Sequence, residues 1–113
     1  SHYDIRFKTS AFRIKNTVHV VPNASSPASV YSEICIRPKA LWIYNQLEPE
    51  KDELQGLFEE DVVWRGDGDS HIAKIEHLAN FDTEECRDAA MQWLAETSAK
   101  LYDYLKPIVD ENK

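Results

Sequence analysis

The chain has 113 residues, of which 42% are hydrophobic, 29% charged and 11% aromatic. These values predict a single globular domain over residues 1–113, because a disordered chain lacks the aromatic side chains that fill a core. Three glycines and five prolines exclude collagen-like or low-complexity sequence. No apolar run approaches the ~20 residues that cross a membrane. The first residues, Ser1-His2-Tyr3, lack a methionine, so we expect residues 1–10 to hold a tag remnant or excision boundary and a short edge strand.

Charge is unevenly distributed along the chain. Residues 1–44 carry six basic and two acidic residues (+4), whereas residues 45–113 carry seven basic and eighteen acidic residues (−11), which together give the net charge of −7. A polyanion would be repelled by the second half and could approach only the first. The alternative interpretation is that both halves are ordinary solvated surfaces.

Alternation of apolar and polar residues predicts three strands in the first 45 residues. Over residues 12–20 the apolar set is Phe12, Ile14, Val18 and Val20, and the other face holds Arg13, Lys15, Thr17 and His19. This pattern is typical of a half-buried strand with a basic outer face, which a turn at Asn16 could divide into a hairpin. The proline-containing stretch 21–27 predicts a loop. Residues 30–37 and 40–45 predict two further strands joined by a short turn.

The second half predicts a helix, a hairpin and a longer helix. Pro49 and the acids around it are typical of a helix start, and apolar residues at 54, 57 and 58 share one helical face. Residues 62–65 and 71–78 predict a hairpin around the turn 66–69. The last helix should begin at an Asp82 cap, present one long apolar stripe, and kink or end at Pro107. We expect residues 109–113 to fray.

These elements predict an α+β fold of order β-β-β-α-β-β-α. Short turns favour a mostly antiparallel sheet of about five strands, and the two amphipathic helices must bury their stripes on one face of that sheet.

The polar turn after Trp64 offers the most suggestive residues for catalysis or metal binding. Asp67, Asp69 and His71 alternate there, and carboxylate and imidazole groups can bind a divalent metal. However, the position that should supply the twelfth-residue carboxylate of a calcium loop is Leu78, and Asp and Gly are the usual residues of a plain turn. We therefore expect no metal site, no cofactor and no catalytic residue in this domain.

The two cysteines, Cys35 and Cys86, form no C-x-x-C pair, which excludes the common zinc and redox motifs. We expect both to be buried thiols in a reducing compartment, consistent with a cytoplasmic protein; a bridge between them is the alternative.

A surface offers a third kind of site. Basic residues on neighbouring strands, together with two aromatic residues on one strand face, would form a platform for unpaired or flipped bases. Its members are Arg13, Lys15, Arg37, Lys39, Trp42 and Tyr44. The alternative is that Trp42 and Tyr44 fill the core beneath the helices.

Residues 29–107 contain an ordered series of features: Leu41-Trp42-Ile43-Tyr44, the acidic stretch 50–59, Asp61-Val62-Val63-Trp64-Arg65, and the segment from Trp93 to Pro107. In this order of features the chain resembles a domain of unknown function found at the C-terminus of restriction-endonuclease-like and other defence-associated proteins. The resemblance implies an accessory module beside a nuclease or helicase, with no catalytic residues of its own.

Together with the basic aromatic face, the resemblance implies a non-catalytic recognition domain of a prokaryotic DNA-defence protein. It would bind nucleic acid, or a nuclease or helicase domain of the same or a partner chain, through the basic aromatic face. The alternative is a protein-interaction or homodimerisation module that binds no nucleic acid.

Overall fold

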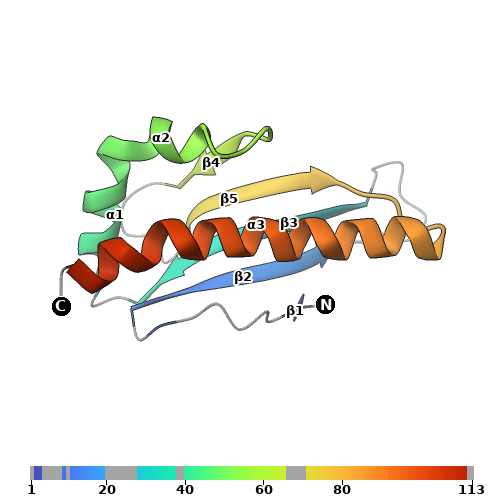
Figure 1. Ribbon diagram of the computed structural model, residues 1–113, viewed down its shortest axis with the longest axis horizontal. Helices are drawn as coiled ribbons and strands as arrows, with labels where there is room; N and C mark the ends of the chain where they lie inside the picture. Colours follow the sequence, from blue (N-terminus) through green and yellow to red (C-terminus); the bar gives the residue numbers. More distant parts are fainter. Residues whose placement is uncertain are drawn as a thin grey trace.

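The structure is a computed structural model that describes residues 2–3, 9, 11–19, 28–37, 40–65 and 71–111, with only the backbone of residues 2, 3 and 71. Figure 1 shows the long C-terminal helix lying along a twisted sheet, with a smaller helical segment beside one end. The elements in chain order are β1 (His2–Tyr3), β2 (Phe12–His19), β3 (Ser29–Ile36), α1 (Trp42–Leu47), the 3₁₀ turn η2 (Glu48–Glu50), α2 (Lys51–Gln55), β4 (Val62–Trp64), β5 (His71–Leu78) and α3 (Glu84–Glu111).

All neighbouring strands pair antiparallel, in the order β1-β2-β3-β5-β4. The pair at one edge is short, because β1 has only two residues, so four strands form the body of the sheet. The predicted α+β class with an antiparallel sheet is confirmed. The longest pairings join β3 to β2 and to β5, which makes β3 the central strand.

The strand predicted over residues 40–45 is wrong, because this segment forms α1. Leu41, Trp42, Ile43 and Tyr44 alternate over too few residues to separate strand from helix, and such bulky residues favour strands in isolation. Ala40, Ile43 and Leu47 are all buried, and their spacing of three and four residues matches one helical face. Burial of this stripe decides in favour of the helix.

The predicted acidic helix is also shorter than expected. The chain passes from α1 through η2 into α2, which ends at Gln55 before Gly56. Of the three apolar residues expected on its inner face, Leu54 is fully buried and Phe58 packs against the core, but Leu57 is 43% exposed.

The last helix begins one residue later than predicted and ends later too. Thr83, not Asp82, supplies the cap, because its Oγ1 accepts a hydrogen bond from the Cys86 amide at 3.1 Å. The helix continues past Pro107 to Glu111, and Val109 is buried. The helix therefore does not end at Pro107, and residues 109–111 belong to it, since burial of the last turn offsets the hydrogen bond that proline cannot donate.

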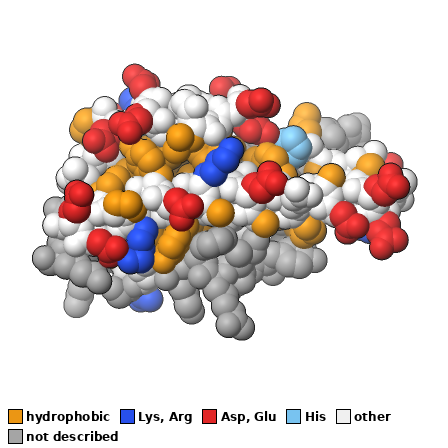
Figure 2. Space-filling view, viewed as in Figure 1, with side chains coloured by type: hydrophobic (Ala, Val, Ile, Leu, Met, Phe, Trp, Pro, Cys, Tyr) orange, Lys and Arg blue, Asp and Glu red, His pale blue; other side chains and the backbone are white. Residues whose placement is uncertain are grey.

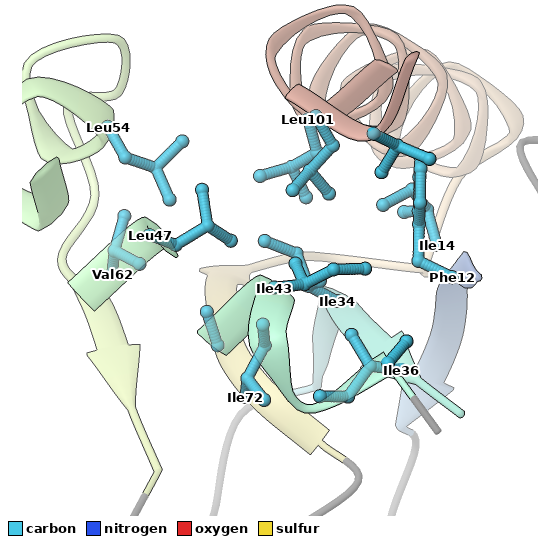
Figure 3. Close-up of a cluster of buried hydrophobic side chains, with 14 of the residues drawn as sticks. Phe12, Ile14, Ile34, Ile36, Ile43, Leu47, Leu54, Val62, Ile72 and Leu101 are labelled. Carbon is cyan, nitrogen blue, oxygen red and sulfur yellow. The ribbon is translucent and has the colours of Figure 1, made fainter. Parts of the chain in front are cut away.

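The core lies between α3, α1 and one face of the sheet (Figure 3). Phe12 and Ile14 of β2 and Ile34 and Ile36 of β3 meet Leu101 of α3 in this layer. Ile43 and Leu47 of α1 extend it toward Leu54 and Val62. A smaller cluster around Val30, Ala90 and Leu94 continues the contact toward the start of α3.

A group of buried polar residues lies within this apolar layer, with Asn16 at its centre. Asn16 has no exposed surface, and its Oδ1 accepts hydrogen bonds from Ser32 Oγ at 2.5 Å and Ser98 Oγ at 2.8 Å. It therefore links β2 to β3 and to α3. The turn predicted at Asn16 is wrong, because β2 runs unbroken from Phe12 to His19.

We expect Asn16→Ala to lower the free energy of unfolding by about 1–3 kcal/mol, because the Ser32 and Ser98 hydroxyls would lose their buried acceptor. Urea denaturation followed by circular dichroism measures this loss. Asn45→Ala, at an exposed position of α1, is the matched control and should change the value by no more than about 0.5 kcal/mol. Equal effects of the two substitutions would contradict the role given to Asn16.

Candidate functional site

The predicted basic residues of β2 lie on the face of the sheet turned away from α3, called the far face below. Side chains alternate along a strand, and Phe12, Ile14 and Asn16 point toward α3. Arg13 and Lys15 therefore point the other way, with Arg13 exposed and Lys15 half-buried.

Arg37 lies just past the end of β3, the strand beside these two cations. Its amide donates a hydrogen bond to the Ala11 carbonyl at 3.1 Å, which carries the pairing of β2 with β3 one step past Phe12 and Ile36. Arg37 is exposed and follows Cys35, the partner of Arg13, by two residues. Diagonal neighbours of this kind lie within reach of each other across two strands. Three of the four predicted cations therefore come together, and the fourth, Lys39, lies outside the described residues.

A further cation and an aromatic ring extend the far face onto β5. Lys74 pairs with Glu33 of β3, which in turn pairs with Lys15. The Lys74 ammonium lies 4.8 Å from the centre of the Tyr31 ring, a cation–π contact. Glu33 is buried, and its strand position lies between those of Lys15 and Lys74. Glu76 accepts a hydrogen bond from Ser29 Oγ at 2.8 Å. The cluster of Arg13, Lys15, Arg37 and Lys74 is named the cationic strand cluster.

Trp42 and Tyr44 do not share a strand face with these cations. They lie two residues apart in α1, where successive side chains point in different directions, and both pack against the main core. The Tyr44 ring meets Trp64 edge-on at 6.4 Å. The stacking platform predicted from their alternation is wrong in its geometry, because their segment is helical. On the far face, Tyr31 is the aromatic residue beside a cation.

The polar turn that follows Trp64 lies largely outside the described residues. Asp67 and Asp69 are among the residues not described, as is the side chain of His71. Among the described side chains, no group of three or more histidine, cysteine, aspartate or glutamate residues could hold a metal ion.

The cysteines are both free, but only one is buried. Cys35 lies on the central strand, where burial raises the pKa of its thiol to about 11; Glu33 adds to the rise, and Arg13 and Lys15 oppose it. At neutral pH it is an unreactive thiol. Cys86, on the first turn of α3, is half-buried rather than buried.

In the native protein we expect a maleimide reagent to modify Cys86 at least about tenfold faster than Cys35 at pH 8, because the thiolate is the reactive form and needs access. Mass spectrometry of peptides from a quenched time course measures both rates. In denaturant the two rates should converge. A faster native reaction at Cys35 would contradict the burial described here.

A second cluster, which no motif indicated, lies on the α3 side of the molecule. Glu60 Oε2 accepts a hydrogen bond from the Trp93 indole at 3.0 Å and lies 2.8 Å from His77 Nδ1. A carboxylate can only accept, so His77 donates from Nδ1. The His77 and Trp93 rings stack with centres 4.9 Å apart. His77 and Trp93 lie 17 and 33 positions after Glu60 in the sequence, so no local sequence pattern could have predicted this cluster.

Glu60 is an ionised carboxylate of fixed orientation. Burial alone would raise its pKa, but hydrogen bonds from its own backbone, His77 and Trp93 outweigh that effect and lower the pKa below the ordinary 4.5. Near the other end of α3, Tyr104 lies beside Glu50 at 3.5 Å. Burial, followed by the charges of Glu50 and Glu53, raises the pKa of Tyr104 to about 12.

The lowered pKa of Glu60 predicts a pH-dependent contribution to stability. A carboxylate whose pKa falls on folding stabilises the protein above its unfolded pKa, and the effect is lost as pH falls through the folded value. The difference in unfolding free energy between wild type and Glu60→Gln should therefore be constant near neutrality and shrink below about pH 4.5.

Thermal or urea unfolding from pH 7 to pH 3 measures this difference. Glu59→Gln, at an exposed neighbour for which the structure describes no such hydrogen bonds, is the matched control. A difference for Glu60→Gln that grows on acidification would contradict the assignment.

The geometry defines a small α+β domain with a cationic strand cluster on one side and an oriented carboxylate on the other. The sequence profile of one family, described as Domain of unknown function (DUF4268), matches residues 1–109. The chain belongs to this family. No curated protein and no solved structure matches it. None of the described helices is long and apolar enough to span a membrane.

Proposed function

We propose that the chain is a non-catalytic recognition domain that contacts nucleic acid through the far face of the sheet. The observation that supports this most is the placement of Arg13 and Lys15 on the far face of β2, with Arg37 just past the end of β3 and Lys74 on β5. Basic side chains on a strand surface can track a phosphate backbone, and the salt dependence of such binding reports how many phosphates they neutralise.

The distribution of acids on the rest of the molecule supports the same side. Residues 48–61 carry seven acidic residues and one lysine, and they form η2, α2 and the turn before β4. Residues 84–111, which form α3, carry seven acidic and three basic residues. Figure 2 shows these acids spread over the α2 and α3 side. A polyanion would be repelled there and drawn to the far face.

Tyr31 gives the far face an aromatic ring that a base could stack on, a contact of about 1–3 kcal/mol per base in single-strand binding proteins. The ring is half-buried and already carries Lys74 above it. Lys74 can move to a phosphate while the ring receives a base, because a lysine side chain is flexible. Among the described elements, the helices α1, α2 and α3 do not lie on the far face, so this face favours an unpaired strand over a groove-reading mode.

The proposed setting is a prokaryotic DNA-defence protein of the restriction type in the cytoplasm, in which this domain accompanies a nuclease or helicase domain. The order of features from residue 29 to residue 107 supports this setting through the resemblance described above. In such a protein the cleavage or unwinding chemistry belongs to the neighbouring domain, and this domain contributes contact with the nucleic acid.

We expect the double substitution Arg13→Gln and Lys15→Gln to weaken binding to a labelled single-stranded oligonucleotide, and to reduce the slope of log K against log salt by about 1 to 1.5, since each phosphate contact on a single strand contributes about 0.7. Fluorescence anisotropy at several salt concentrations measures both quantities.

The matched control is Lys51→Gln with Lys106→Gln, which removes the same charge from side chains that pair with Glu48 and Asp110 on the acidic side. The control should leave the slope unchanged. Equal losses in both double variants, or no binding by the wild type at low salt, would contradict the proposed function.

A further inference from the structure

A band of half-buried aromatic side chains lies between α2 and α3 on the acidic side of the molecule. Figure 2 shows hydrophobic atoms reaching the surface along this band. Its members pack against the main core from four parts of the chain: Tyr44, Phe58, Trp64, Trp93 and Tyr104. Next to Phe58, Leu57 is 43% exposed. Aromatic side chains at a surface supply most of the binding energy in many protein interfaces.

Acidic residues border the band on both sides. Glu50 and Glu53 border it from the α2 side, where both act on Tyr104. On α3, Glu96 and Asp103 lie within four residues of Lys100, which places them along the same side of the helix. Lys100 itself extends over Phe58, with its ammonium 5.7 Å from the ring centre. An ammonium group therefore already lies over an aromatic ring of the band. This contact indicates that the surface can bind cationic side chains of a partner.

Glu60 is positioned to bind a further cation at one end of the band. Both side-chain donors to its carboxylate, from His77 and Trp93, use Oε2. The Glu60 backbone also forms a hydrogen bond to this carboxylate. These bonds fix the orientation of the carboxylate. A carboxylate has about four acceptor positions, so Glu60 can also accept from a guanidinium or ammonium group, which form strong charge-assisted hydrogen bonds with carboxylates.

The length of the band fits a helical partner. Trp93 and Tyr104 are eleven residues apart on α3, which corresponds to about 16 Å along a helix, or about three turns. An amphipathic helix that binds an apolar surface contacts it with its i, i+3, i+4 and i+7 side chains. We propose that the band between α2 and α3 docks an amphipathic helix of a partner protein that carries arginine or lysine beside its apolar residues.

The acidic residues around the band favour a basic helix over two other possible partners, nucleic acid and a second copy of this chain. Nucleic acid is repelled by the same acids that would attract a basic helix. A second copy of this chain is a poorer fit, because its own cationic strand cluster lies on a sheet face rather than on a helix with an apolar stripe. This docking surface lies on the opposite side from the far face, so it is independent of the proposed nucleic-acid contact.

The test uses a fluorescent synthetic helix of about 14 residues, roughly four turns, with leucines on one face and arginines flanking them. A scrambled peptide of identical composition is its control. Fluorescence anisotropy measures affinity, and NMR spectra of the ¹⁵N-labelled protein locate the contact. The Trp93 indole signal, assigned with Trp93→Phe, reports directly on the hydrogen bond to Glu60.

Two substitutions with matched controls separate this surface from general attraction between opposite charges. Glu60→Gln should weaken binding about fivefold or more, whereas Asp88→Asn, at an exposed acid near the start of α3, should change it less than twofold. Phe58→Ala should weaken binding about tenfold, whereas Leu78→Ala, at a residue 67% exposed at the end of β5, should leave it unchanged.

Tighter binding of the amphipathic peptide than of its scrambled isomer, with shifts at Trp93 and Trp64, would support the proposal. Equal binding of the two peptides would overturn it, as would shifts confined to the first turns of α3. Concentration-dependent self-association that Phe58→Ala abolishes would also overturn it, because the occupant would then be a second copy. Glu60→Gln and Phe58→Ala are not expected to reduce DNA binding, so the outcome of this test is independent of the proposed nucleic-acid function.

Discussion

The burial of one stripe of α3 against one face of the sheet is the contact on which the rest of the structure depends. Leu94, Leu101 and Leu105 lie in that contact with almost no exposed surface, and Asn16 joins the two layers at its centre through Ser32 and Ser98. A buried polar atom costs free energy unless it is bonded. The Asn16 Nδ2 has no partner among the described residues, but the two bonds to Oδ1 favour one placement of the helix over neighbouring ones. That placement brings Trp93 to Glu60 and Tyr104 to Glu50.

The same contact gives the domain two sides of different chemistry. With the apolar face of the sheet covered by α3 and α1, the outer surface on that side comes from the acidic residues of α2 and α3 (Figures 1 and 2). The far face of the sheet keeps the cations of β2 and β5, interrupted by Glu33 and Glu76. Segregation of charge in a small domain favours partners of opposite sign on its two sides. The two proposals made here, nucleic acid on one side and a basic helix on the other, follow from that separation.

Much of this fold could be predicted from the sequence, and the exceptions have physical reasons. Period-two alternation located β2, β3 and β5, and the long apolar stripe located α3, because these patterns extend over eight or more residues. The segment around Trp42 failed because four alternating bulky residues fit a strand and a helix equally, and tertiary burial of Ile43 and Leu47 decided the outcome. Asn16 failed because a buried asparagine and a turn asparagine look alike until its partners from β3 and α3 are known.

The candidate functional residues also include some that the sequence could predict and some that it could not. Arg13 and Lys15 were predictable because they are local to one strand, whereas the Glu60, His77 and Trp93 cluster depends on three distant segments.

The central claim is that charges of opposite sign lie on opposite sides of the domain. It is tested most directly by the relaxation of backbone amide protons with anionic and cationic nitroxide probes. The account predicts stronger relaxation by the anionic probe along β2 near Arg13 and by the cationic probe along α2 and α3. Equal relaxation by both probes along β2 would contradict it.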